Sequence, residues 1–230
     1  HHIPDASLGP LSSSDRYRGS TDFTDLSACD VIIVCVPTPL AQGRTPDLSY
    51  VTSTGREIGG HIRPGTLVVL ESTTYPGTTR REFAAAIASA CTGRCRLGTD
   101  YLIAYSPERE DPGNASHTTV SIPKLVGGLD ARSTDAAAAV YRRAVRDVVE
   151  VSSAEVAEAA KILENVYRAV NIALVNEMKV VLDAMGIDVW EVIRAAATKP
   201  FGYQPFYPGP GLGGHCIPID PYYLSWRANE

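Results

Sequence analysis

The sequence lacks an apolar run long enough to cross a membrane and has no basic excess. Its longest apolar run, residues 31–36 (VIIVCV), is far short of the ~20 residues that a spanning helix needs. No basic-then-apolar signal pattern opens the chain. The net charge is −5, and the 21 Lys and Arg are scattered. We therefore expect a cytoplasmic protein that binds neither membranes nor nucleic acid.

Cysteine is scarce and irregularly spaced. The five cysteines, at 29, 35, 91, 95 and 216, form an odd number without a disulfide framework, so reduced thiols are expected. Cys91 and Cys95 are close in sequence, but no second Cys or His pair accompanies them to complete a zinc site. No metal is expected.

Residues 1–152 show the alternation of an α/β domain. Apolar runs typical of strands buried in a parallel sheet lie at 31–36, 66–70, 102–105, 124–126 and 148–151. Helices are expected between them at 48–58 (with Asp47 as N-cap), 79–90 and 133–145. This order predicts a Rossmann-like, doubly wound parallel sheet, which binds ligands beyond the carboxyl ends of its strands. The sheet is expected to be partial, because the sequence begins after the point where the strand, Gly-x-Gly-x-x-Gly turn and helix that open such domains should lie.

Residues 153–230 show the pattern of an α-helical central domain with a long spine helix. Apolar residues recur at steps of three and four from 154 to 185, and Gly186 is placed to end this helix. Asp188 is expected to cap a short helix, and Asp220 to cap a terminal one. Lys199–Pro218, rich in Pro and Gly, is predicted to be an ordered loop. Since one domain cannot cover so many apolar residues, the long helix is predicted to form a homodimer contact.

Residues able to carry chemistry gather near the end of the chain. In Gly211–Asp220 the glycines allow close backbone approach to a ligand, and Cys216 precedes the Asp220 carboxylate by four residues. Cys216 is a candidate nucleophile, although a free cysteine is equally compatible with a small buried apolar residue. Lys161 and Asn165 share one face of the long helix, either toward a ligand or as a solvated flank.

Polar segments also follow two of the predicted strands. Glu71–Thr74 and Ser106–Asp111 place hydroxyls and carboxylates at the carboxyl edge of the sheet. Turns favour the same residue types, so each segment is compatible with either a ligand contact or a simple turn.

Five segments in this order resemble the UDP-glucose/GDP-mannose dehydrogenase family from about Asp22 onward. They are Val36-Pro37-Thr38-Pro39, Glu71–Thr79 (ESTTYPGTT), Ser106-Pro107-Glu108-Arg109, Glu158-x-x-Lys161-x-x-x-Asn165 and Gly213–Asp220 (GGHCIPID). The resemblance implies an NAD-dependent enzyme of polysaccharide or glycoconjugate biosynthesis. It would oxidise the C6 alcohol of a UDP-hexose to a carboxylate, in four electrons, through a thiohemiacetal and a thioester on a cysteine. Residues 200–210 look more like members acting on UDP-N-acetylhexosamines than like UDP-glucose enzymes.

The resemblance also implies roles for single residues. Its catalytic residues would be Cys216 as nucleophile, Lys161 and Asn165 as oxyanion stabilisers, Asp220 in proton transfer, and Thr73 and Glu108 near nicotinamide, water and C6. Its cofactor-binding residues would be Val36, Pro37, Thr38, Ser72, Thr73 and Glu108. Its substrate-binding residues would be Lys161, Asn165, Tyr207, Gly211, Gly213 and Gly214. The second glutamate of some family members is Pro112 here, which leaves the water-activating group open between Glu108, Asp111 and neither.

Two other functions stay open. A two-electron 3-hydroxyacid dehydrogenase also pairs a Rossmann domain with Lys-x-x-x-Asn on a long helix, but it has no use for a thiol at 216. An inactive dimerisation fragment or pseudoenzyme would need only the long helix. The family's C-terminal UDP-binding domain is not among these 230 residues, and without the pyrophosphate turn the chain alone is expected to bind NAD weakly.

Overall fold

The computed structural model describes residues 9–10, 14, 16–91, 93, 95–110, 118–214 and 217–230. They form two compact units. The first unit is built from residues within 1–37, 48–72 and 77–157, and the second from residues within 38–47, 73–76 and 158–230.

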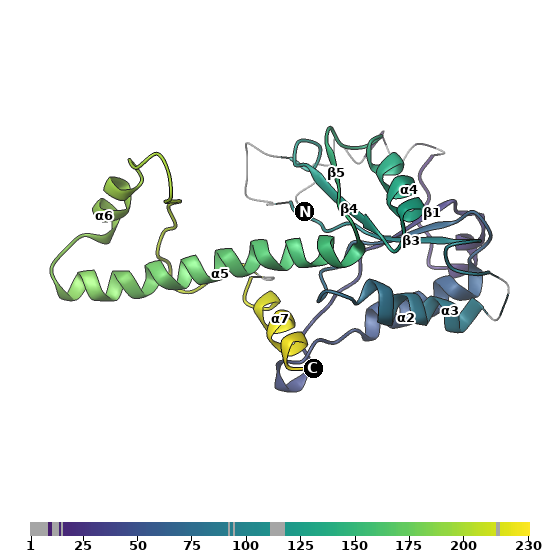
Figure 1. Ribbon diagram of the computed structural model, residues 1–230, viewed down its shortest axis with the longest axis horizontal. Helices are drawn as coiled ribbons and strands as arrows, with labels where there is room; N and C mark the ends of the chain where they lie inside the picture. The colour runs from purple at the N-terminus through teal and green to yellow at the C-terminus, as the bar shows by residue number, and fades with distance from the viewer. Residues whose placement is uncertain are drawn as a thin grey trace. The chain divides into compact units, whose positions relative to one another are not determined.

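A five-stranded sheet forms the centre of the first unit (Figure 1). In their order across the sheet, the strands are β1 (Val31–Val34), β2 (Leu67–Leu70), β3 (Leu102–Tyr105), β4 (Lys124–Gly128) and β5 (Val148–Glu150). β1, β2 and β3 are parallel, and so are β4 and β5. β3 and β4 are antiparallel, with Tyr105 opposite Gly127. The expectation of a wholly parallel sheet is therefore wrong at this pair, because a strand buried on both faces has the same apolar sequence in either direction.

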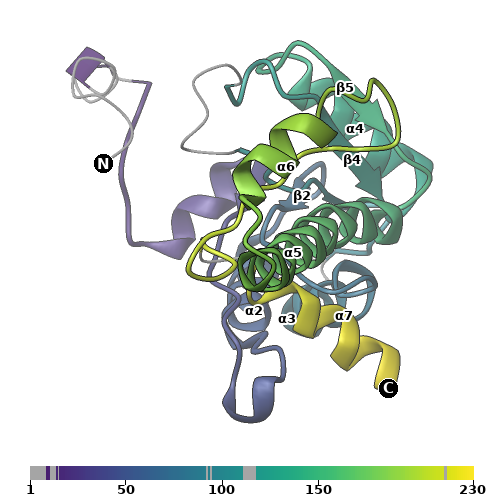
Figure 2. The same ribbon diagram turned by 90° about the vertical axis from the view of Figure 1, so that its left-hand side faces the viewer.

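Helical segments cover both faces of this sheet. In chain order they are η1 (Phe23–Ala28), α2 (Ser49–His61), the π-helical turn η3 (Thr79–Phe83), α3 (Ala84–Cys91) and α4 (Ala131–Tyr141). α2 and α3 pack with Val68 and Leu70 on one face, while α4 packs with Leu67 and Val69 on the other (Figures 1 and 2). Since successive strand residues point to opposite faces, β2 is buried on both sides. This confirms the doubly wound α/β class.

Two glycines at the end of β4 allow the following helices to approach the strand backbone. A β-carbon on Gly127 would lie 2.1 Å from the carbonyl oxygen of Ser153, the residue before α5 (Ala154–Ala184). A β-carbon on Gly128 would lie 2.4 Å from the backbone nitrogen of Thr134 in α4. Neither position leaves room for a side chain, so this pair fixes where α4 and α5 begin.

The second unit is mainly helical. α5 is one helix of 31 residues that starts in the first unit and continues through the second. Gly186 follows its end with a φ of 70°, and the Asp188 side chain caps α6 (Val189–Ala196), both as expected. The unit also contains the short turn η2 (Gln42–Arg44) and the terminal helix α7 (Asp220–Asn229).

Two expected N-caps are wrong. Leu48, not Asp47, occupies the N-cap position of α2, without a side-chain cap bond. Asp220 lies in the first turn of α7, after the N-cap residue Ile219, and its carboxyl group is hydrogen-bonded to Asn165 instead. In the described ranges, no helix combines the length and apolarity that a membrane span requires. Those ranges also contain no cluster of three or more His, Cys, Asp or Glu suited to a metal ion.

Candidate active site

The residues after β1 and β2 include part of the expected cofactor site. The Val36 N–H donates to the Ser72 hydroxyl oxygen at 2.8 Å, and the Ser72 hydroxyl donates to the Val36 carbonyl oxygen at 2.8 Å. This reciprocal pair joins two of the predicted cofactor-binding residues across neighbouring strand ends. Pro37, the next predicted residue, is exposed beside them.

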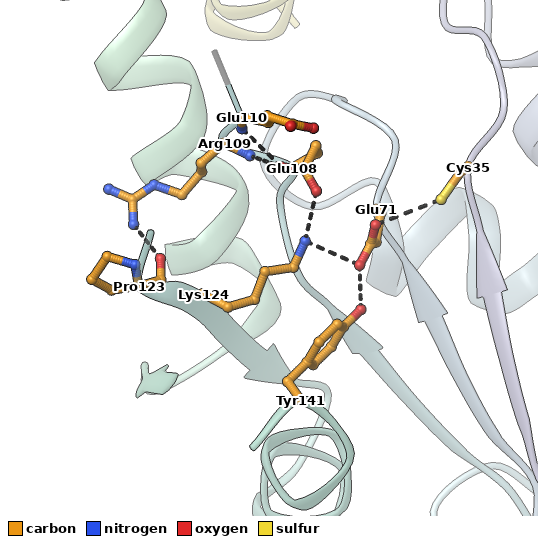
Figure 3. A network of polar contacts seen from close by, with 8 residues as sticks. All are labelled: Cys35, Glu71, Glu108, Arg109, Glu110, Pro123, Lys124 and Tyr141. Atoms are coloured by element: carbon orange, nitrogen blue, oxygen red, sulfur yellow. Dashed lines mark hydrogen bonds and ion pairs between the residues drawn. The ribbon is translucent and has the colours of Figure 1, made fainter. Parts of the chain in front are cut away.

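A network of charged and polar side chains lies at the same edge of the sheet (Figure 3). The Lys124 ammonium nitrogen is 3.1 Å from Glu71 Oε1 and 3.1 Å from Glu108 Oε2. The Tyr141 hydroxyl donates to Glu71 Oε1 at 2.5 Å, and the Cys35 thiol donates to Glu71 Oε2 at 3.6 Å. The side chains of Lys124 and Glu71 are only 8% and 12% exposed, whereas that of Glu108 is 46% exposed. Glu108, a predicted catalytic residue, and Cys35 are thus the exposed members of a network that is otherwise largely buried.

Lys124 and Tyr141 were not predicted as site residues. Lys124 is the first residue of β4, and because β4 runs antiparallel to β3, its beginning lies at the carboxyl edge of β1–β3. A parallel strand would have placed Lys124 at the opposite edge. The sequence signal for Lys124 was its place as the first residue of an otherwise apolar, buried strand. Lysine is almost never fully buried without a partner.

The network controls the charge of its members. Burial raises the pKa of Glu108, but the Lys124 ammonium and the backbone N–H groups of Arg109 and Glu110 outweigh it, so the pKa is lowered overall. Burial and the neighbouring Glu71 raise the pKa of Cys35 to about 11 and also raise that of Tyr141. Glu108 is therefore ionised at neutral pH, while the Cys35 thiol stays protonated and is a poor nucleophile.

In the second unit, the structure brings three predicted catalytic residues together. The Asn165 amide donates to Asp220 Oδ2 at 2.5 Å, with these residues 4% and 2% exposed. Lys161 lies half-buried one turn before Asn165 on α5. Burial raises the pKa of Asp220, and the Asn165 hydrogen bond and the Lys161 charge oppose this only in part. The arrangement joins α5 to the first turn of α7.

The two predicted threonines, Thr38 and Thr73, also belong to the second unit. The Thr38 carbonyl oxygen accepts a hydrogen bond from the Tyr223 hydroxyl, which ties the residues after Pro37 to α7. Thr73 is half-buried, and the hydroxyl of the fully buried Thr74 beside it has no hydrogen-bond partner among the described residues. A buried hydroxyl of this kind is usually satisfied by water or a ligand.

The predicted sugar-binding loop is attached to α5 by Asn176, which was not predicted as a site residue. Asn176 Oδ1 accepts from the Gly209 N–H at 2.9 Å, and Asn176 Nδ2 donates to the Gly211 carbonyl oxygen at 3.4 Å. Its signal was spacing, because Asn176 follows Asn165 by eleven residues, close to three helical turns. One amide thus holds both ends of the Gly209–Gly211 turn.

The other predicted loop residues are exposed. Gly213 and Gly214 have φ values of 71° and 73°, a conformation that glycine adopts readily. The Tyr207 ring stacks on Trp190 of α6, with centroids 6.0 Å apart and an interplanar angle of 16°. Cys216, the expected nucleophile, and Asp111, the alternative to Glu108, lie outside the described residues, so their roles stay predictions from the sequence.

Comparisons with known proteins show that the chain is similar to nucleotide-sugar dehydrogenases. Residues 3–145 match the model of the UDP-glucose/GDP-mannose dehydrogenase family, NAD binding domain, and residues 155–230 match that of its central domain. A UDP-N-acetyl-D-glucosamine 6-dehydrogenase from Pseudomonas aeruginosa is 40% identical over 221 residues, which are 96% of this chain and 51% of that protein.

Two solved structures are similar over most of the chain. The UDP-D-ManNAc dehydrogenase from Pyrococcus horikoshii has a TM-score of 0.85 at 37% identity, covering 92% of this chain and 49% of its own. A UDP-glucose dehydrogenase from Pyrobaculum islandicum has the same TM-score of 0.85 at 27% identity, covering 98% and 52%. This chain spans about half the length of the relatives that it matches.

Proposed function

Because the chain belongs to the UDP-glucose/GDP-mannose dehydrogenase family, we propose that it carries the oxidation site of an NAD-dependent nucleotide-sugar 6-dehydrogenase. The proposed reaction converts the C6 alcohol of a UDP-N-acetylhexosamine to a carboxylate in two successive two-electron oxidations.

The observation that carries this proposal is the group formed by the buried Asn165 and Asp220 and the half-buried Lys161. A carboxyl group buried beside an amide costs folding free energy, and such costs are concentrated at functional sites. An ammonium and an amide on one helix face are suited to stabilising negative charge that develops on the C6 oxygen. Asp220, whose charge acts on Lys161, would hold that ammonium and accept or return its proton.

The first unit is proposed to bind NAD at the ends of β1 and β2. After β1, the exposed Pro37 follows the Val36–Ser72 pair, at the strand ends where doubly wound sheets bind dinucleotides. These residues would hold the cofactor, which supplies the hydride acceptor for each oxidation. The ionised Glu108 would accept a proton from water in the hydrolytic step.

Cys216 is proposed to link the two oxidations. Its thiolate would add to the C6 aldehyde to form a thiohemiacetal, and loss of a second hydride from C6 would leave a thioester. Attack by water then breaks the carbon–sulfur bond, releasing the carboxylic acid and the free thiol. A thiol thus explains how one site carries out both oxidations.

We also propose a preferred substrate and a partner for this chain. An N-acetylated sugar is favoured because the relatives named for N-acetylhexosamines share more sequence with this chain than the UDP-glucose enzyme does. The partner is proposed to be a second copy, because a stripe of exposed apolar residues runs along α5.

The test is to incubate the longest natural form of the protein carrying these residues with NAD and each of UDP-GlcNAc, UDP-ManNAc, UDP-GalNAc and UDP-glucose. NADH is measured by absorbance and uronic acid by mass spectrometry. Two NADH per acid is the expected stoichiometry. One NADH per molecule of aldehyde would favour a two-electron enzyme, and no turnover with any UDP-sugar would overturn the proposal.

A further inference from the structure

Lys124 is a buried cation that joins two carboxylates from neighbouring strand ends (Figure 3). Glu71, after β2, is held in place by three contacts: it accepts hydrogen bonds from Tyr141 and Cys35 and pairs with Lys124. The Lys124 ammonium also lies 5.3 Å from the centre of the Tyr141 ring. Glu71 and Tyr141 therefore form a rigid anchor for the lysine.

Glu108 is oriented from two sides. Its Oε1 accepts the backbone N–H groups of Arg109 at 2.7 Å and Glu110 at 2.8 Å, and its Oε2 accepts from Lys124 at 3.1 Å. The Arg109 guanidinium donates to the carbonyl oxygen of Pro123 at 2.8 Å, which ties the segment after β3 to the residue preceding Lys124. The carboxylate is thus fixed in direction although its side chain is nearly half exposed.

We propose that Lys124 is a positioning residue that, anchored by Glu71, holds the Glu108 carboxylate in place at the carboxyl edge of the sheet. The work that Glu108 does, activating water, rests on the proposed function. A purely structural reason for Lys124 is weak, because a buried ion pair stabilises a fold no better than apolar residues of similar volume. A held carboxylate with one side open to solvent is what general-base catalysis requires.

The proposal makes opposite predictions for two variants. The titratable groups around Glu108 are Cys35 after β1, Glu71 after β2, Arg109 and Glu110 beside it, Lys124 of β4 and Tyr141 of α4. Lys124→Met removes the facing positive charge, so Glu108 should titrate about one pH unit or more higher. Glu71→Gln removes the negative charge that also pairs with Lys124. Lys124 then pairs with Glu108 alone, so the pKa of Glu108 should fall. Loss of a merely structural contact would not shift the titration in opposite directions.

The experiment is a carboxyl ¹³C NMR titration of the purified protein, with the Glu108 signal assigned by its absence in Glu108→Gln. Lys124→Arg, which retains the charge, should titrate close to wild type. Arg63→Met is the matched control, since it removes a cation paired with Asp30 before β1, away from the carboxyl edge. An unchanged Glu108 titration in Lys124→Met, or shifts of the same sign in both key variants, would overturn the proposal.

If Lys124→Met does not fold, a double variant tests the same proposal. The double variant Lys124→Met/Glu71→Gln leaves no unpaired buried charge, and Glu108 should titrate higher in it than in Glu71→Gln. Equal titrations would again overturn the proposal. In parallel, the acid limb of uronic acid formation should follow the NMR titration. If wild type makes no acid the proposed function fails, while the NMR result still decides the role of Lys124.

Discussion

The Asp220 carboxyl group is buried beside the Asn165 amide, and burial raises its pKa above the ordinary value. A raised folded-state pKa means that this group favours the folded state at low pH, and that the benefit is lost as the pH rises through the folded-state pKa. Above the folded-state pKa the buried carboxylate therefore costs stability.

We expect Asp220→Asn to raise the melting temperature at pH 7 by a few degrees while abolishing uronic acid formation. The amide retains an acceptor for Asn165 but carries no charge, so the gain over wild type should shrink as the pH falls toward 4. Thermal unfolding from pH 4 to 8 measures this. Asp183→Asn, at an exposed carboxylate on α5 paired with Lys179, is the control and should lack that trend. A gain that grows toward acid pH would contradict the sign of the Asp220 shift.

Cys216 supports a second prediction at the residue scale. Cys216→Ser should leave UDP-sugar binding nearly unchanged but abolish uronic acid formation, because a hydroxyl without an activating base is a poor nucleophile. Binding is measured by calorimetry and the acid by mass spectrometry. Cys29→Ser, at a half-buried thiol bonded to the Asp25 carbonyl, is the matched control and should retain activity. Normal acid formation by Cys216→Ser would exclude the thioester route.

At the scale of elements, α5 carries two different surfaces. Lys161, Asn165 and Asn176 lie within about 60° of one another around the helix, since each residue advances it by about 100°. On the opposite side lie exposed apolar side chains, namely Leu163, Tyr167, Val170, Leu174, Met178, Val181 and, directly after the helix, Met185. The same helix can therefore build the proposed site on one side and meet a partner on the other.

The contact between Asn176 and its loop gives a prediction for the first of these surfaces. Asn176→Ala removes two hydrogen bonds to the Gly209–Gly211 turn, worth about 0.5–1.5 kcal/mol each. We expect KM for the UDP-sugar to rise about tenfold, the effect of 1.4 kcal/mol, with a smaller change in kcat. Asn171→Ala, which removes an amide bonded to the Tyr167 carbonyl on the same helix, should leave KM unchanged. Equal KM values for the two variants would remove the role of Asn176.

How well each element could be predicted depends on whether residues nearby in sequence or distant ones determine it. β2 and α5 are set by local apolar patterns, so their positions follow closely from the sequence. The direction of β4 depends on its neighbour β3, which the pattern does not encode, and Lys124 was missed for that reason. The cap at Asp47 failed because the chain enters α2 through Leu48, while the Asp47 N–H donates to the Pro39 carbonyl oxygen.

At the scale of the whole molecule, the family and the NAD binding domain could be predicted, and both are confirmed. The order of the motifs along the chain can be recognised without knowing which residues are in contact. The residues that form the second unit could not be predicted in this way. Residues 38–47 and 73–76 belong to the second unit, although in sequence they lie between elements of the first. They are tied to α7 by long-range contacts, including Tyr75 with Trp226 at 4.9 Å and Arg44 over the Tyr222 ring at 4.9 Å. No local pattern indicates such contacts.

The exposed stripe on α5 leads to a prediction about assembly. Its seven apolar side chains are 41–68% exposed, and burying one of that size contributes about 1.5–3 kcal/mol. We therefore expect a homodimer at tens of micromolar by light scattering, and a monomer when Leu174→Glu and Val181→Glu place two charges in the stripe. Leu224→Glu, at a similarly exposed apolar residue on α7, should remain dimeric. A wild-type monomer at that concentration, or a dimer that survives both charges, would show that α5 is not the contact, since two carboxylates without partners cannot be buried at a tight interface.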